Sequence, residues 1–121
     1  MKWSEATEEN CPIARSLAIF GDRWTLLIIR NAFLGMTRFE QFQKHLGLTR
    51  HVLSERLNRL VEQGILIKQP YQERQQRYEY VLTDKGLALA PILKAMLDWG
   101  MDWTDAQIPA QIQEKMQQHI A

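Results

Sequence analysis

The residues best suited to chemistry form a short polar row that begins at Thr49. Arg50, His51 and Ser54 would lie toward one side of a helix, because successive helical residues are about 100° apart. Their guanidinium, imidazole and hydroxyl groups can form hydrogen bonds with the edges of DNA bases. We therefore predict that these three residues read bases, with the Thr49 hydroxyl near the sugar–phosphate backbone.

The opposite side of the same segment is apolar. Leu53, Leu57, Leu60 and Val61 share this side when the segment is helical. A DNA-reading helix needs one side packed on its domain and polar side chains free at its N-terminal half. An ordinary amphipathic surface helix would show the same division, so the helix alone leaves both interpretations open.

Positive charge is concentrated around this helix. The chain carries a net charge of only +1, but residues 38–77 contain eight Lys or Arg and four acidic residues. A cationic middle between anionic flanks is what a phosphate-facing surface requires. Four cations are predicted to hold the backbone or the minor groove: Arg38, Lys68, Arg74 and Arg77. Two more lie on the flanks of the helix: Arg56 and Arg59.

The elements that must position these residues begin with two short helices. Thr37 and Glu40 would form a capping box at the start of the first. Gly47 can take the left-handed conformation that ends it. Thr49 would then cap the second helix, which Gly64 ends. Two helices joined by a short turn with a Gly are typical of a helix-turn-helix.

A β-hairpin of residues 65–82 is predicted directly after this helix-turn-helix of residues 37–63. Residues 65–68 and 77–82 are rich in β-branched and aromatic side chains, and Pro70 suits a strand end or edge. A helix-turn-helix followed by a basic hairpin is a winged helix. We therefore expect a mainly α fold with one small β-hairpin.

Length and composition favour one globular domain over residues 1–121. The hydrophobic fraction is 45% and the charged fraction 24%. A single cysteine excludes an internal disulfide framework and favours a reducing compartment. No signal-peptide pattern opens the sequence, and no apolar run is long enough to cross a bilayer. We expect a soluble cytoplasmic protein that does not contact membranes.

Further helices are predicted on both sides of the winged helix. Pro12 would open an N-terminal helix, and Thr83 would cap a long helix of residues 84–104. Pro91 lies inside this helix and should bend it or interrupt one of its hydrogen bonds. These helices carry more large apolar residues than one stripe needs, which favours a subunit interface. The alternative is that all of them serve the chain's own core. The predicted interface residues are Ile13, Leu17, Leu93, Met96, Leu97, Trp99 and Trp103.

The combination of motifs resembles the HxlR family of bacterial winged helix-turn-helix transcription regulators, over roughly residues 11–100. The resemblance implies a homodimer in which the N- and C-terminal helices form the interface and two recognition helices enter successive major grooves. The chain departs from the family at residues 75–76, where a proline is usual, and at residues 48–49, where isoleucine and serine are favoured. The matching motifs are Cys11-Pro12, residues 21–28 (GDRWTLLI), Arg38-Phe39, residues 53–59 (LSERLNR), residues 64–66 (GIL), residues 77–80 (RYEY), Leu82-Thr83, Gly86, Pro91 and Trp99-Gly100.

The resemblance also implies that the cysteine matching Cys11 senses oxidants or electrophiles in some members. Cys11 would lie at a helix N-terminus, where free N–H groups favour the thiolate. Without a second cysteine, oxidation could give a sulfenic acid, a mixed disulfide or a bond to Cys11 of another subunit. The alternative is a small buried hydrophobic residue without reactivity.

We therefore predict a transcription regulator that binds an inverted-repeat operator in double-stranded DNA as a homodimer, with a small-molecule effector as a further partner. The three histidines, His45, His51 and His119, are isolated, without Glu or Asp at ligand spacing and without a second cysteine, and no phosphate loop or nucleophile motif occurs. We accordingly expect no enzyme activity, no metal and no cofactor. The rival interpretation is a winged helix used for protein–protein contact, with its basic surface facing an acidic partner.

Overall fold

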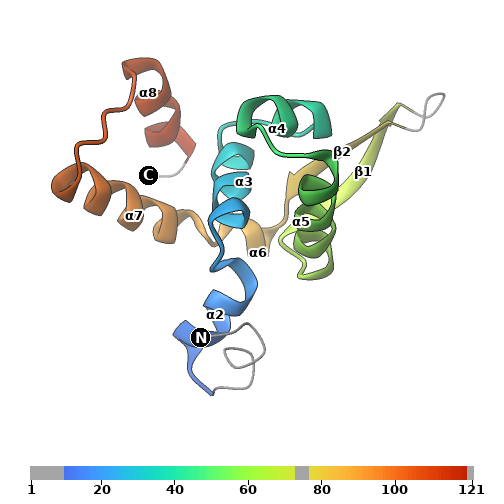
Figure 1. Ribbon diagram of the computed structural model, residues 1–121, viewed down its shortest axis with the longest axis horizontal. Helices are drawn as coiled ribbons and strands as arrows, with labels where there is room; N and C mark the ends of the chain where they lie inside the picture. The colour runs from blue at the N-terminus through green and yellow to red at the C-terminus, as the bar shows by residue number, and fades with distance from the viewer. Residues whose placement is uncertain (1–9, 73–76, 120–121) are drawn as a thin grey trace.

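The computed structural model describes residues 10–72 and 77–119, and its fold is mainly α with one hairpin, as predicted (Figure 1). Helices α3, α4 and α5 and the hairpin form the body, from which α2 projects on one side and α7 and α8 on another. The elements are α2 (Pro12–Phe20), α3 (Arg23–Phe33), α4 (Phe39–Leu46), α5 (Arg50–Glu62), β1 (Leu66–Gln72), β2 (Arg77–Leu82), α6 (Asp84–Leu87), α7 (Ala90–Trp103) and α8 (Ala110–His119).

The core lies where the three helices of the body meet the hairpin. Ile28 and Ile29 of α3 are fully buried, and so is Phe42 of α4. Helix α5 contributes Leu53, Leu57 and Leu60, so the predicted apolar side is the buried side. This packing fixes which face of α5 remains outside.

Local signals in the sequence position the helix-turn-helix. Gly47 takes a φ of 70° and ends α4, and the Thr49 hydroxyl accepts a 3.2 Å hydrogen bond from the Val52 N–H at the start of α5. Asp22 caps α3 by accepting a 2.7 Å hydrogen bond from the Thr25 N–H. The predictions for Gly47 and Thr49 are confirmed.

The predicted capping box of Thr37 and Glu40 is wrong. The Gln41 side-chain oxygen instead accepts hydrogen bonds from the N–H groups of Thr37 and Arg38, each at 3.0 Å. Helix α4 starts later than predicted because the Thr37 carbonyl is engaged elsewhere: it accepts a 2.6 Å hydrogen bond from the Tyr80 N–H in β2.

This contact sets the segment before α4 beside β2, where Arg38 and Glu79 form an isolated antiparallel bridge. The hairpin itself is antiparallel and pairs Leu66 with Leu82. Strand β1 extends beyond the predicted end at residue 68, with a register shift near Pro70, because the edge position tolerates a residue without an N–H.

The prediction of one bent helix over residues 84–104 is also wrong. The chain forms two helices, α6 and α7, and Pro91 lies in the first turn of α7. A proline lacks the N–H of a helix interior and disfavours helical conformation in the residue before it, so a break precedes it. Gly86 of α6 packs so closely on the wing that a Cβ there would collide with the Ile65 carbonyl oxygen.

The C-terminal arm consists of α7 and α8. Leu93 of α7 and Met116 of α8 are both buried in the cluster that contains the core. Within residues 10–72 and 77–119, no helix has the length and apolar character needed to cross a membrane.

Candidate nucleic-acid interface

The N-terminal half of α5 presents the predicted reading residues together. Arg50, His51 and Ser54 are all exposed, and the neighbouring Leu53 is fully buried. Thr49 is exposed as well, and its hydroxyl oxygen caps the helix. Each of these side chains can therefore meet a ligand without disturbing the core.

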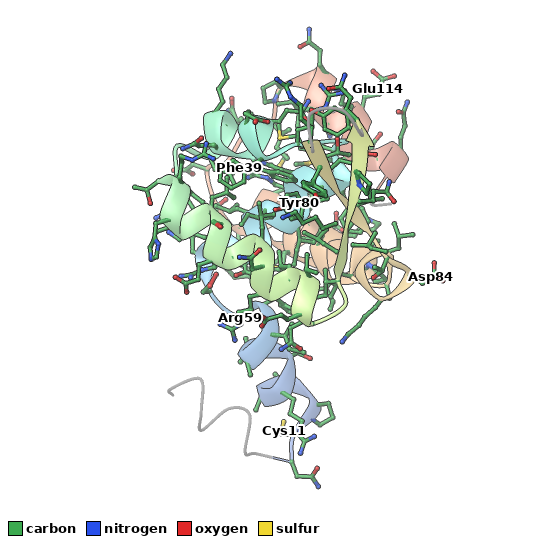
Figure 2. The ribbon with its side chains drawn as sticks, turned by 90° about the vertical axis from the view of Figure 1, so that its right-hand side faces the viewer. Cys11, Phe39, Arg59, Tyr80, Asp84 and Glu114 are labelled. Carbon is green, nitrogen blue, oxygen red and sulfur yellow. The ribbon has the colours of Figure 1, made fainter. Side chains whose placement is uncertain are left out.

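Arg50 is oriented by an aromatic ring from the preceding helix. Its guanidinium carbon lies 4.7 Å from the centroid of the Phe39 ring. Figure 2 shows Phe39 beside the upper end of α5. A cation held over an aromatic face gains electrostatic attraction and loses freedom, so Phe39 supports the direction in which Arg50 points.

The basic residues of the wing lie on aromatic rings in the same way. The Arg38 guanidinium lies 4.3 Å from the Tyr71 centroid, and Lys68 Nζ lies 4.7 Å from the Tyr78 centroid. Sequence reasoning missed these supporting aromatics. The available signal was the interleaving of tyrosine with basic residues in both strands.

The wing and the segment before α4 therefore carry exposed cations. Arg38, Lys68 and Arg77 are all exposed, and the 2.6 Å bond from the Tyr80 N–H to the Thr37 carbonyl holds the segment of Arg38 against the hairpin. Arg74 lies outside the described residues. Exposed cations on a wing can contact phosphates, and polar donors on a helix can contact bases.

Arg56 lies away from this surface and contacts α3. Its Nε lies 3.0 Å from an Asp22 carboxylate oxygen, and its Nη1 lies 2.8 Å from Glu55 Oε1. Asp22 is also the N-cap of α3, so this ion pair joins the reading helix to the start of another helix.

Arg59 is engaged with α2. Its Nη2 donates a 2.6 Å hydrogen bond to the Ala18 carbonyl oxygen, and Figure 2 shows Arg59 where α5 approaches α2. Burial lowers the pKa of Arg59, while the nearby Asp22 carboxylate raises it. The structure thus gives Arg56 and Arg59 contacts with neighbouring helices, because the flanks of α5 face α2 and the start of α3. The predicted DNA contacts of these two residues stay predictions.

Cys11 is the N-cap residue of α2, as predicted, and its half-buried side chain carries a free thiol. It lies at the end of α2 that is farther from the body (Figure 2). A change at this thiol would act on the projecting helix and not on the reading surface directly.

Most of the predicted interface residues are exposed. The exposed fraction is 73% for Ile13, 64% for Trp99 and 75% for Trp103, and Leu17 and Met96 are about half exposed. Leu93 is an exception, because it is only 8% exposed and packs in the core, and Leu97 is half-buried. The assignment of Leu93 to an interface is therefore replaced by a core role.

Comparison with known proteins places the chain in a family. Residues 19–108 match the HxlR-like helix-turn-helix family. An uncharacterized HTH-type transcriptional regulator of Mycobacterium bovis, Mb3122, is 42% identical over 95 residues, which are 78% of this chain and 60% of that protein. The match thus spans less than two thirds of the length of this relative.

Solved structures share the fold. The structure of PA1607, a proposed transcription factor, has a TM-score of 0.78 and 45% identity, covering 88% of this chain and 74% of that one. The redox regulator HypR in its oxidized form has a TM-score of 0.71 and 29% identity, covering 79% of this chain and 100% of that one. By its matched residues and its winged helix, the chain belongs to the HxlR-like helix-turn-helix family.

Proposed function

We propose that the protein regulates transcription in the cytoplasm by binding a DNA operator sequence-specifically as a homodimer. The observation that carries this proposal is the exposed polar end of α5, where Arg50 is oriented over Phe39 at 4.7 Å while the opposite side of the helix is fully buried. Arg50, His51 and Ser54 read base edges in the major groove.

The wing supplies affinity in this proposal. Arg38, Lys68 and Arg77 are exposed cations that neutralise phosphates or enter the minor groove, and Arg74 remains a candidate for the same role. Such contacts fix the orientation of a protein on the duplex without carrying sequence information directly.

The projecting helices supply the dimer. Ile13 of α2 and Trp99 and Trp103 of α7 are more than half exposed, which a monomer in water does not favour. A two-fold dimer places two copies of α5 about one helical turn apart, or a multiple of it, so the operator is an inverted repeat with half-sites roughly 10 bp apart.

Cys11 links the dimer to oxidants in this proposal. The support is its free thiol at the N-terminus of projecting α2 and the similarity of the chain to the redox regulator HypR. Two Cys11 thiols of one dimer would transfer two electrons and two protons to the N=N bond of a thiol oxidant such as diamide, which becomes a hydrazine, and form one disulfide bond between subunits. This bond would change the separation of the two reading helices.

Selection of bound genomic fragments followed by footprinting tests the central proposal. The expected footprint has dyad symmetry, and the affinity falls linearly with the logarithm of salt concentration. A footprint without a dyad would contradict the dimeric mode. The rival function, a protein–protein module with a basic surface, is favoured if mixed genomic DNA is bound without dependence on salt.

A further inference from the structure

An apolar cavity lies between α3, α7 and α8, away from the reading surface. Its volume is about 300 Å³, at the lower end of the range for small-molecule sites of about 300–1,000 Å³. In Figure 1, α7 and α8 form an arm beside α3. Its described lining is apolar apart from one charged residue, and includes Leu26, Leu27, Arg30, Leu97, Gly100 and Met116.

The one charge in this lining is Arg30. Its Nε donates a 3.0 Å hydrogen bond to the Asn31 side-chain oxygen, and burial lowers the pKa of its guanidinium. None of the ion pairs among the described residues includes Arg30. A cation that is half removed from water is costly unless an anion accompanies it, and a guanidinium offers its outer N–H groups to a carboxylate as a fork.

The cavity side of α7 adjoins the proposed dimer surface. Leu93, Leu97 and Gly100 lie on the side of α7 that lines the cavity, and Met96 and Leu97 belong both to this lining and to the predicted interface. Trp103 and Trp99 lie roughly a quarter to a third of a turn away around the same helix, since each residue adds about 100°. A partner subunit centred on the two tryptophans would therefore border the cavity at Met96.

We propose that this cavity binds an apolar aromatic molecule that carries one carboxylate, with the Arg30 guanidinium holding the carboxylate and the leucine and methionine side chains enclosing the ring. The charge complementarity of Arg30 selects an acid, and the remaining apolar lining selects a hydrocarbon body. The cavity volume suits a molecule with a single aromatic ring or two fused rings.

Asn31 connects this site with the helix-turn-helix. It is fully buried, and its Nδ2 lies 3.1 Å from His45 Nδ1 at the end of α4. The outer N–H groups of Arg30 can hold a carboxylate while its Nε keeps the hydrogen bond to Asn31, so one side chain would join the ligand to the contact between α3 and α4. Any effect of the ligand on operator binding rests on the proposed function.

Calorimetric titration of the full chain with 1-naphthoate and with neutral 1-naphthamide tests the site without DNA. We expect saturable binding of one naphthoate per chain and about tenfold or more weaker binding of the amide. R30Q should remove this preference, and R30K should retain part of it. The matched control is R23Q, which removes an exposed cation from the other end of the same helix and should leave the preference unchanged.

Gly100 provides a variant that does not depend on Arg30. A Cβ at this position would meet no atom within 4 Å, so G100M places a side chain in the cavity without a clash. It should fold at least as well as the wild type, because glycine disfavours helix interiors, and should bind naphthoate about tenfold or more weakly.

Equal affinity of the wild type for acid and amide, or no naphthoate binding at all, would overturn the proposal. In the second case a side chain of another copy or of this chain fills the cavity. Neither outcome bears on DNA recognition, because no DNA is present. Conversely, naphthoate binding that depends on Arg30 stands even if no operator is found.

Discussion

Arg59 donates a 2.6 Å hydrogen bond to the carbonyl oxygen of Ala18, a residue 41 positions earlier in the chain. The bond joins the reading helix α5 to the projecting helix α2. Arg56 makes a second connection a turn earlier, through its 3.0 Å ion pair with Asp22 at the start of α3. Two arginines of α5 thus fix this helix against both N-terminal helices.

Arg59→Met should lower the free energy of unfolding by about 1–3 kcal/mol, because the partly buried Ala18 carbonyl loses a charged donor. Urea denaturation monitored by circular dichroism measures this change. The matched control is Arg50→Met, which removes an exposed guanidinium from the same helix and should change stability by about 0.5 kcal/mol or less. Equal losses in both variants would contradict the scaffold role of Arg59.

Arg50 and Arg77 should differ in what they contribute to DNA binding. Arg50→Ala should cost about 1–3 kcal/mol at the operator and change base preference, since its target is a base edge. Arg77→Ala should weaken binding to all DNA sequences by a similar factor. It should also reduce the slope of log affinity against log salt concentration by up to about one unit. Fluorescence anisotropy over a series of salt concentrations, on operator and mutated duplexes, separates the two. An unchanged salt slope for Arg77→Ala would assign that residue a structural role.

Substitutions of Trp103 and Leu93 should affect different properties, namely dimer formation and folding, although both residues lie on α7. Trp103 is 75% exposed, so Trp103→Glu should dissociate the dimer and leave a folded chain. Leu93 is 8% exposed in the core, so Leu93→Glu should unfold the C-terminal arm, because it buries a charge without a partner. Sedimentation and circular dichroism measure the two effects. A wild type that is already a well-folded monomer at micromolar concentration would exclude this interface.

Cys11 should account for the whole response to oxidants, because it is the only cysteine. Diamide should lower operator affinity of the wild type and yield a reducible cross-linked dimer on a denaturing gel. Cys11→Ser should bind the operator normally and show neither effect. The same loss of affinity in both proteins would end the switch hypothesis and leave Cys11 as a packing residue.

The sequence was sufficient for features that depend on short-range chemistry. Gly47 and Thr49 mark the turn and the second helix because the left-handed conformation and the hydroxyl cap require these residue types locally. The apolar side of α5 followed from helical periodicity. Pro91 also carried a local signal, but one that fits a first turn as well as a bend.

Features set by tertiary contacts could not be predicted in this way. The flank positions of Arg56 and Arg59 do not reveal that α2 and α3 lie against that side. The strand-like bond between Thr37 and Tyr80 joins residues far apart in the sequence, and it displaced the predicted cap of α4. The place of Arg30 in the lining of a cavity depends on the packing of α7 and α8 beside α3, which the sequence does not reveal.

The two connections through Arg56 and Arg59 have a mechanical consequence. Because α5 is bonded to both neighbours, we expect it to turn with them as one rigid body, which would leave a subunit little internal flexibility. In a dimer, adjustment to operators of slightly different half-site spacing must then come from the joint between subunits. The exposed tryptophans of α7 would form the hinge between the subunits. The stiffness of this hinge would set the range of half-site spacings that the protein accepts.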